Sequence, residues 1–219
     1  VCILGSFRYH LCRHYFEQPE AERVSEQTTK PEPSLFSLLA RDAAIALAAL
    51  SLWAAADTWY LVSGLGFALA VSVLDAIFVG YILGALFHEW GHYTGAKFSG
   101  ASAPRVKPKG TSLFRFNFDM ATNTQRQFHW MSFGGWVFHW GLLLILVAAL
   151  PFDSIGRIAL VSSVFGFILY ATFIETGILR QTLGGSDPAE TLGQLSAKTF
   201  QQAGIVGSVA GLFALATLS

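Results

Sequence analysis

Residues 81–98 read YILGALFHEWGHYTGAKF, which sets two histidines and a glutamate within an apolar run. On a helix, His88 and His92 lie on one face with their Cβ atoms about 6 Å apart. Two imidazoles in that arrangement can share one metal ion, and the His-Glu-x-x-His spacing is typical of zinc sites. Glu89 is placed to act on a metal-bound water as general base. The stretch therefore predicts a helix with His88 and His92 as metal ligands and Glu89 as the catalytic group.

The composition predicts that this helix lies in a membrane. Hydrophobic residues make up 53% of the 219 residues and charged residues only 13%, whereas about 25% of the residues of an ordinary soluble domain are charged. The formal net charge is zero, which argues against nucleic acid as a partner. We expect an integral membrane protein whose surroundings are the lipid bilayer.

Apolar stretches recur along the chain, and each is long enough to cross the hydrocarbon layer as a helix of about 20 residues. No repeat of fixed period divides the chain, so we expect one domain. It covers residues 42–219 and follows a polar segment over residues 1–41. The five predicted spans are residues 42–61, 67–98, 130–150, 158–179 and 203–218, each with approximate ends.

The distribution of positive charge predicts the orientation of these spans. Of the 14 lysines and arginines, only Arg157 falls in a connection on the side opposite the N-terminus. Positive residues concentrate on the cytoplasmic side of membrane proteins, so we expect a multi-pass protein of the bacterial inner membrane with its N-terminus in the cytoplasm. His88 and His92 then lie about 9 to 15 Å from the cytoplasmic end of their span.

Polar side chains at the depth of the histidines are candidates for a third ligand, because they are costly inside a membrane. Asp187 follows the fourth span and two glycines that can fold it back toward the metal, so it ranks first. Glu175, inside the fourth span, is the alternative, as a ligand or as an interhelical hydrogen-bond partner. His139 either lines the cleft or belongs to an aromatic belt. Asp75 lies about 20 Å from His88 along the helix, which suits a packing or partner-binding role.

A short hairpin is predicted after the metal-binding helix. The stretch LFRFNFDM, residues 113–120, alternates apolar and polar side chains as a strand does. PRVKPKG, residues 104–110, can pair with it, with Gly110 at the turn. An edge strand there can hold an unwound substrate in extended form, although a hairpin that only rests on the membrane is equally compatible. The predicted fold class is thus all-α, with about five transmembrane helices and this hairpin.

The stretch YILGALFHEWGHYTGAKFSGA, residues 81–101, resembles the metal helix of site-2 proteases, the intramembrane zinc metalloproteases that release membrane-anchored regulators. The order of elements is also similar: a metal helix, a surface hairpin, a span that opens with SFGGWVFHW, and a later aspartate. The resemblance implies that residues 42–219 form a metalloprotease-like domain. It further implies that His88, His92 and Asp187 bind Zn²⁺, that Glu89 activates a zinc-bound water, and that the substrates are membrane proteins.

Some positions depart from the pattern of that family. Gly134-Gly135 stands where the family has Gly-Pro, the usual Asn and Pro before Leu-Asp-Gly are absent, and one additional span precedes Asp187. Two hypotheses follow: a zinc-dependent intramembrane endopeptidase, or a proteolytically inactive accessory subunit of a larger membrane protein complex. The intact HEWGH motif favours the enzyme. A transporter is a weaker third reading, because no internal repeat is present.

Overall fold

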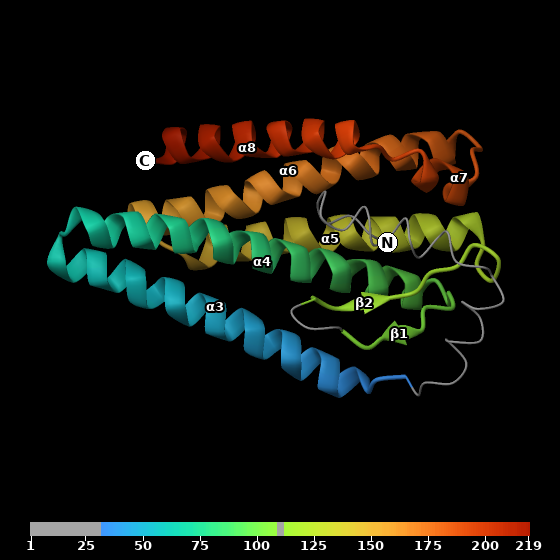
Figure 1. The fold of residues 1–219 in the computed structure, drawn as a ribbon, viewed down its shortest axis with the longest axis horizontal. Coiled ribbons are helices and arrows are strands. Elements are labelled where there is room, and N and C mark those ends of the chain that lie inside the picture. The colour runs from blue at the N-terminus through green and yellow to red at the C-terminus, as the bar shows by residue number, and fades with distance from the viewer. Residues whose placement is uncertain (1–31, 109–111) are drawn as a thin grey trace.

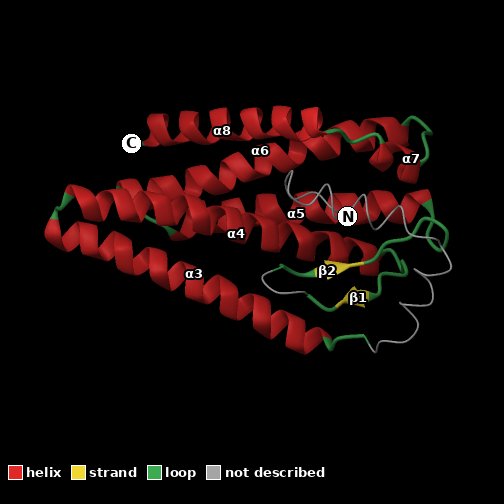
Figure 2. Cartoon of the chain, viewed as in Figure 1, coloured by secondary structure: helices red, strands yellow, loops and turns green. Residues whose placement is uncertain are grey.

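The computed structural model describes residues 32–108 and 112–219, and within them long helices dominate (Figure 1). Most of the predicted N-terminal segment, residues 1–41, and the predicted turn residue Gly110 lie outside the described residues. A short hairpin and one short helix make up the rest of the secondary structure in these described residues (Figure 2). The elements are α3 (Leu35–Ser63), α4 (Gly66–Phe98), β1 (Arg105–Val106), β2 (Arg115–Phe116), α5 (Gln125–Ala149), α6 (Ile155–Leu183), α7 (Pro188–Gly193) and α8 (Ala197–Leu218).

Five helices in the described part of the chain, α3, α4, α5, α6 and α8, are long and apolar enough to cross a membrane. This confirms the predicted all-α fold with five spans and a hairpin. Helix α4 packs against α3, α5 and α6, and α8 packs against α6. The connections α3–α4 and α5–α6 lie at one end of the bundle, and the hairpin and α7 lie at the other (Figure 1). We call the latter the hairpin end.

The first span begins earlier than the predicted residue 42. Ser34 caps α3 by accepting a hydrogen bond from the backbone N–H of Ser37, and the helix runs on through Asp42 without a break. Asp42 is buried and accepts hydrogen bonds from the Trp90 indole at 3.0 Å and from Arg41 at 3.3 Å. Because this carboxylate has partners, its charge does not end the apolar helix.

Glycines allow α4 and α5 to approach one another closely. Gly91 and Gly95 on α4 face Gly134 on α5, and a Cβ atom on any of the three would overlap backbone atoms of the opposite helix. Small residues permit this kind of backbone contact between membrane helices. The contact lies at the level of the HEWGH motif, so α5 passes directly beside the two histidines.

The hairpin is attached by aromatic contacts to α4, the helix that carries the HEWGH motif. Strands β1 and β2 pair antiparallel, with Arg105 opposite Phe116. Phe114 and Phe116 are both buried, which agrees with the predicted alternation of apolar and polar side chains. Phe114 stacks on Trp90 of the HEWGH motif, with ring centroids 4.0 Å apart and 10° between the planes. The hairpin is therefore held against the helix that carries the histidines.

A buried carboxylate joins three helices at the end of the bundle opposite the hairpin. Asp57 of α3 accepts hydrogen bonds from Ser72 of α4 at 3.1 Å and from Ser154, the N-cap of α6, at 2.9 Å. Arg157 forms an ion pair with it, with Nε to Oδ2 at 3.3 Å. The sequence around Asp57 indicates no role for it, because its partners Ser72 and Ser154 come from other parts of the chain.

Candidate metal centre

Three buried side chains meet inside the bundle near the hairpin end: His88 and His92 of α4 and Glu175 of α6. The Nε2 atoms of the two histidines lie 3.0 Å apart. The Glu175 Oε1 atom lies 2.9 Å from Nε2 of His92 and 3.5 Å from Nε2 of His88. These three donor atoms converge on one point, and the group could hold a metal ion.

The donor set and its spacing fit a divalent metal. Two imidazoles and a carboxylate are ligands that zinc accepts, and tetrahedral bonds of about 2.0 to 2.1 Å place ligand atoms about 3.3 Å apart. The three observed separations, 2.9, 3.0 and 3.5 Å, bracket that value. The second oxygen of Glu175 is buried and has no hydrogen-bond partner among the described residues. The carboxylate is thus available to a cation.

Asp187, the carboxylate ranked first from the sequence, lies elsewhere. Its side chain is exposed and caps α7, accepting a hydrogen bond from the backbone N–H of Glu190 at 2.9 Å. Gly185 adopts a φ of 98°, and Pro188 begins the short helix, so the chain turns into α7 at this point. Among the described residues, the carboxylate beside the two histidines is Glu175, the alternative from the sequence.

The ring of His92 is held in one orientation by α5. Its Nδ1 lies 2.9 Å from the carbonyl oxygen of Met131. Because a carbonyl can only accept, Nδ1 carries the hydrogen, and in the neutral ring Nε2 keeps its lone pair. A backbone partner of this kind commonly orients metal-binding histidines. Gly135 packs directly on the ring, where a Cβ atom would lie 2.6 Å from Cε1.

We predict that Gly135→Ala displaces the His92 ring and lowers metal affinity about 10- to 100-fold, the usual effect of disturbing the support of a ligand. Gly141→Ala is the matched control, because it adds the same methyl group to α5 where nothing lies within 4 Å. Zinc affinity of both purified variants is measured by competition with a chelator. Equal affinity in the two variants would show that the Gly135 contact does not position His92.

The structure also places the other residues that the sequence singled out. Glu89 is buried and close enough to interact electrostatically with His92 and Glu175, but it is not one of the three converging groups. His139 is fully buried and stacks on His88, so it lines the site and does not belong to an aromatic belt. Asp75 lies half-buried in α4 and outside the group.

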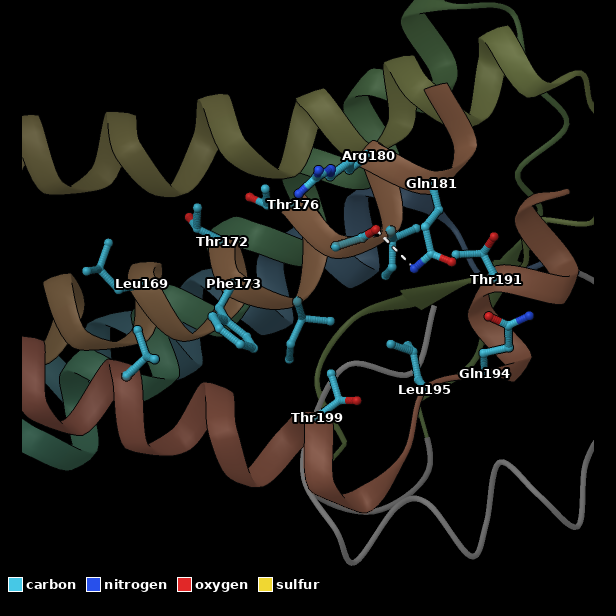
Figure 3. A pocket seen from close by; sticks show the side chains of 14 residues that line it. Leu169, Thr172, Phe173, Thr176, Arg180, Gln181, Thr191, Gln194, Leu195 and Thr199 are labelled. Carbon is cyan, nitrogen blue, oxygen red and sulfur yellow. Dashed lines mark hydrogen bonds between the residues drawn. The ribbon is translucent and has the colours of Figure 1, made fainter. Parts of the chain in front are cut away.

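Two cavities of different size lie near the group. A cavity of about 10 Å³ touches His92 and Glu175, which is roughly the space that one water needs. A larger groove of about 570 Å³ runs between α6, α7 and α8 (Figure 3). Ile178 of α6 lines both spaces. This side chain therefore borders both the groove and the small cavity beside His92 and Glu175.

The site draws on residues that lie far apart in the sequence. Its converging groups come from α4 and α6. Helix α5, which lies between these two helices in the sequence, supplies the supporting contacts of Met131 and His139. Met131 cannot be found from the sequence, because it contributes a backbone carbonyl, which every residue has. Comparisons of the chain with protein-family models, with curated proteins and with solved structures found no match.

Proposed function

We propose that this protein is a zinc-dependent endopeptidase that cleaves membrane-anchored proteins within the membrane. The observation that supports the proposal most directly is the buried convergence of His88, His92 and Glu175, with the buried Glu89 carboxylate within electrostatic range of His92 and Glu175. A general base has to be an acidic residue of this kind, near the ligands but outside the converging group. The resemblance of the HEWGH helix to site-2 proteases points to the same chemistry.

The proposed mechanism assigns a role to each of the four side chains. His88, His92 and Glu175 would hold the ion, and three protein ligands are the number that catalytic zinc sites use. Zinc, when bound, would act as a Lewis acid that polarises a peptide carbonyl and makes water more acidic. Glu89 accepts a proton from the attacking water as the new C–O bond forms. It then returns this proton to the leaving amine as the C–N bond breaks.

The hairpin supplies a way to present the substrate. A helical substrate keeps its amides in internal hydrogen bonds, so it has to be extended before a peptide bond can be attacked. In the described part of the chain β1 and β2 form a two-stranded sheet, and each strand has one edge that an extended segment can join. Because Phe114 beside β2 stacks on Trp90, a segment bound there would lie next to the HEWGH helix.

The proposed orientation places the hairpin end in the cytoplasm of a bacterial cell. Thirteen of the 14 lysines and arginines lie on the N-terminal side of the membrane by our reading of the sequence, and the remaining one, Arg157, lies at the end opposite the hairpin. This asymmetry follows the positive-inside rule. In inverted vesicles the cytoplasmic side faces outward. We therefore expect an impermeant thiol reagent to label a cysteine introduced at Lys107 from the outside of the vesicles, and one introduced at Asp153 only from the inside.

Removal of the metal tests the proposal. Purified protein in liposomes is mixed with single-pass transmembrane peptides, and new peptide termini are identified by mass spectrometry. We expect about one zinc per chain, loss of cleavage after treatment with a strong chelator, and recovery when zinc is added back. Undiminished cleavage by protein from which the zinc has been removed would contradict the proposal.

A second candidate, an accessory subunit without proteolytic activity, is favoured by the size of the inner cavity. About 10 Å³ beside His92 and Glu175 holds a water but not a peptide bond, so a catalytic site must first open. If the protein copurifies in stoichiometric amount with a larger membrane complex and contains no zinc, this candidate is correct. Specific cleavage of any of the transmembrane peptides would exclude it.

A further inference from the structure

His139 contacts His88 at Nδ1, the ring nitrogen that does not face His92 and Glu175. The Nδ1 atoms of the two rings lie 3.1 Å apart. The rings are nearly parallel, with centroids 5.2 Å apart and 4° between their planes. His139 lies on α5, and none of the three converging groups, His88, His92 and Glu175, comes from this helix. The sequence motif gives it no role.

The contact between two Nδ1 atoms allows only two arrangements of hydrogen. A neutral imidazole carries one N–H, so one ring donates and the other accepts. If His88 donates from Nδ1, its Nε2 keeps a lone pair directed toward His92 and Glu175. If His139 donates instead, the hydrogen of His88 sits on Nε2, only 3.0 Å from Nε2 of His92, and His88 can no longer bind a metal.

We infer that His139 is a positioning residue that accepts a hydrogen bond from His88 and thereby keeps its Nε2 free for the metal. The inference rests on the proposed metal site. It assigns to His139 the part that a carboxylate or a backbone carbonyl usually takes behind a metal-binding histidine. The Met131 carbonyl performs that part for His92, and Trp136 lies close enough to interact with the Glu175 carboxylate. Helix α5 thus supports both histidines.

The second ring nitrogen of His139, Nε2, shows why this residue does more than fill space. Nε2 is buried and has no hydrogen-bond partner among the described residues. With His139 accepting at Nδ1, the hydrogen of its ring sits on Nε2, and a buried donor without a partner destabilises the fold. A phenylalanine ring would fill a similar space without that cost. The polar ring is accounted for by its contact with His88.

Metal binding to purified variants tests this role without any substrate. We expect His139→Phe to bind Zn²⁺ about 10- to 100-fold more weakly than wild type, in competition with a chelator. His139→Asn should bind within a few-fold of wild type, because its amide oxygen can replace the acceptor at Nδ1. His129→Phe is the matched control: His129 also lies on α5 but contacts Thr182 of α6. The visible absorption of bound Co²⁺ should change in His139→Phe and not in His129→Phe.

The outcomes keep this inference apart from the proposed function. Each variant is first checked for wild-type helicity and unfolding temperature. If His139→Phe binds zinc as tightly as His129→Phe, while His88→Ala loses binding, the role of His139 is overturned and the metal site stands. An equal loss in His139→Phe and His139→Asn would also overturn it and assign His139 to packing. If wild type binds no stoichiometric zinc, both proposals fail together.

Discussion

Glu89→Gln is expected to keep its metal and to cut transmembrane peptides about 10² to 10⁴ times more slowly than wild type, the usual contribution of a general base. Glutamine has nearly the same shape as glutamate, but its amide cannot take up a proton from water. Glu89 lies outside the three converging groups, so this change removes no ligand. A selective loss of rate would therefore separate the proton-transfer step from metal binding.

The measurement compares zinc content and the rate of appearance of new peptide termini in the same liposome preparation. Glu190→Gln serves as the matched control, because it makes the same chemical change on the exposed face of α7. That variant should retain both zinc and activity. Cleavage by Glu89→Gln at the rate of Glu190→Gln would exclude Glu89 as the base.

Features that depend on local sequence were predictable. The five spans follow from the length of the apolar runs, since about 20 helical residues are needed to cross the hydrocarbon layer. The pairing of His88 with His92 follows from helical periodicity alone. The hairpin follows from alternation over residues 113–120, and the structure buries Phe114 and Phe116 as that pattern requires. Each of these predictions needed only neighbouring residues.

Features that depend on how whole helices are rotated and how deep they lie could not be predicted from neighbouring residues. Glu175 lies inside the fourth span and Asp187 follows that span, and only the packing of α6 against α4 shows which of the two lies beside the histidines. Asp42 marks the predicted start of the first span, although α3 begins at Leu35, and Asp57 lies inside that span. Their partners, Trp90 for Asp42 and Ser154 for Asp57, come from other helices, so the sequence around each aspartate carries no sign of them.

Glu175→Gln and Asp187→Asn should have opposite effects on metal binding. Glutamine at 175 keeps the volume of the side chain but replaces an anionic oxygen with an amide, so we expect zinc affinity to fall by at least about 100-fold, as for loss of a first ligand. Asp187→Asn should bind zinc like wild type. Asparagine caps a helix about as well as aspartate, so α7 is preserved and the stability of the variant should change by less than about 0.5 kcal/mol.

Zinc affinity of the two variants, with His88→Ala as the reference for loss of a ligand, decides which carboxylate completes the site. Retention of zinc by Glu175→Gln together with its loss in Asp187→Asn would assign the third position to Asp187, as the resemblance to site-2 proteases implies. That result would require α7 to move, because Asp187 is exposed and bonded to the backbone of Glu190. The 2.9 Å between His92 and Glu175 requires no movement, and for this reason we expect Glu175 to be the ligand.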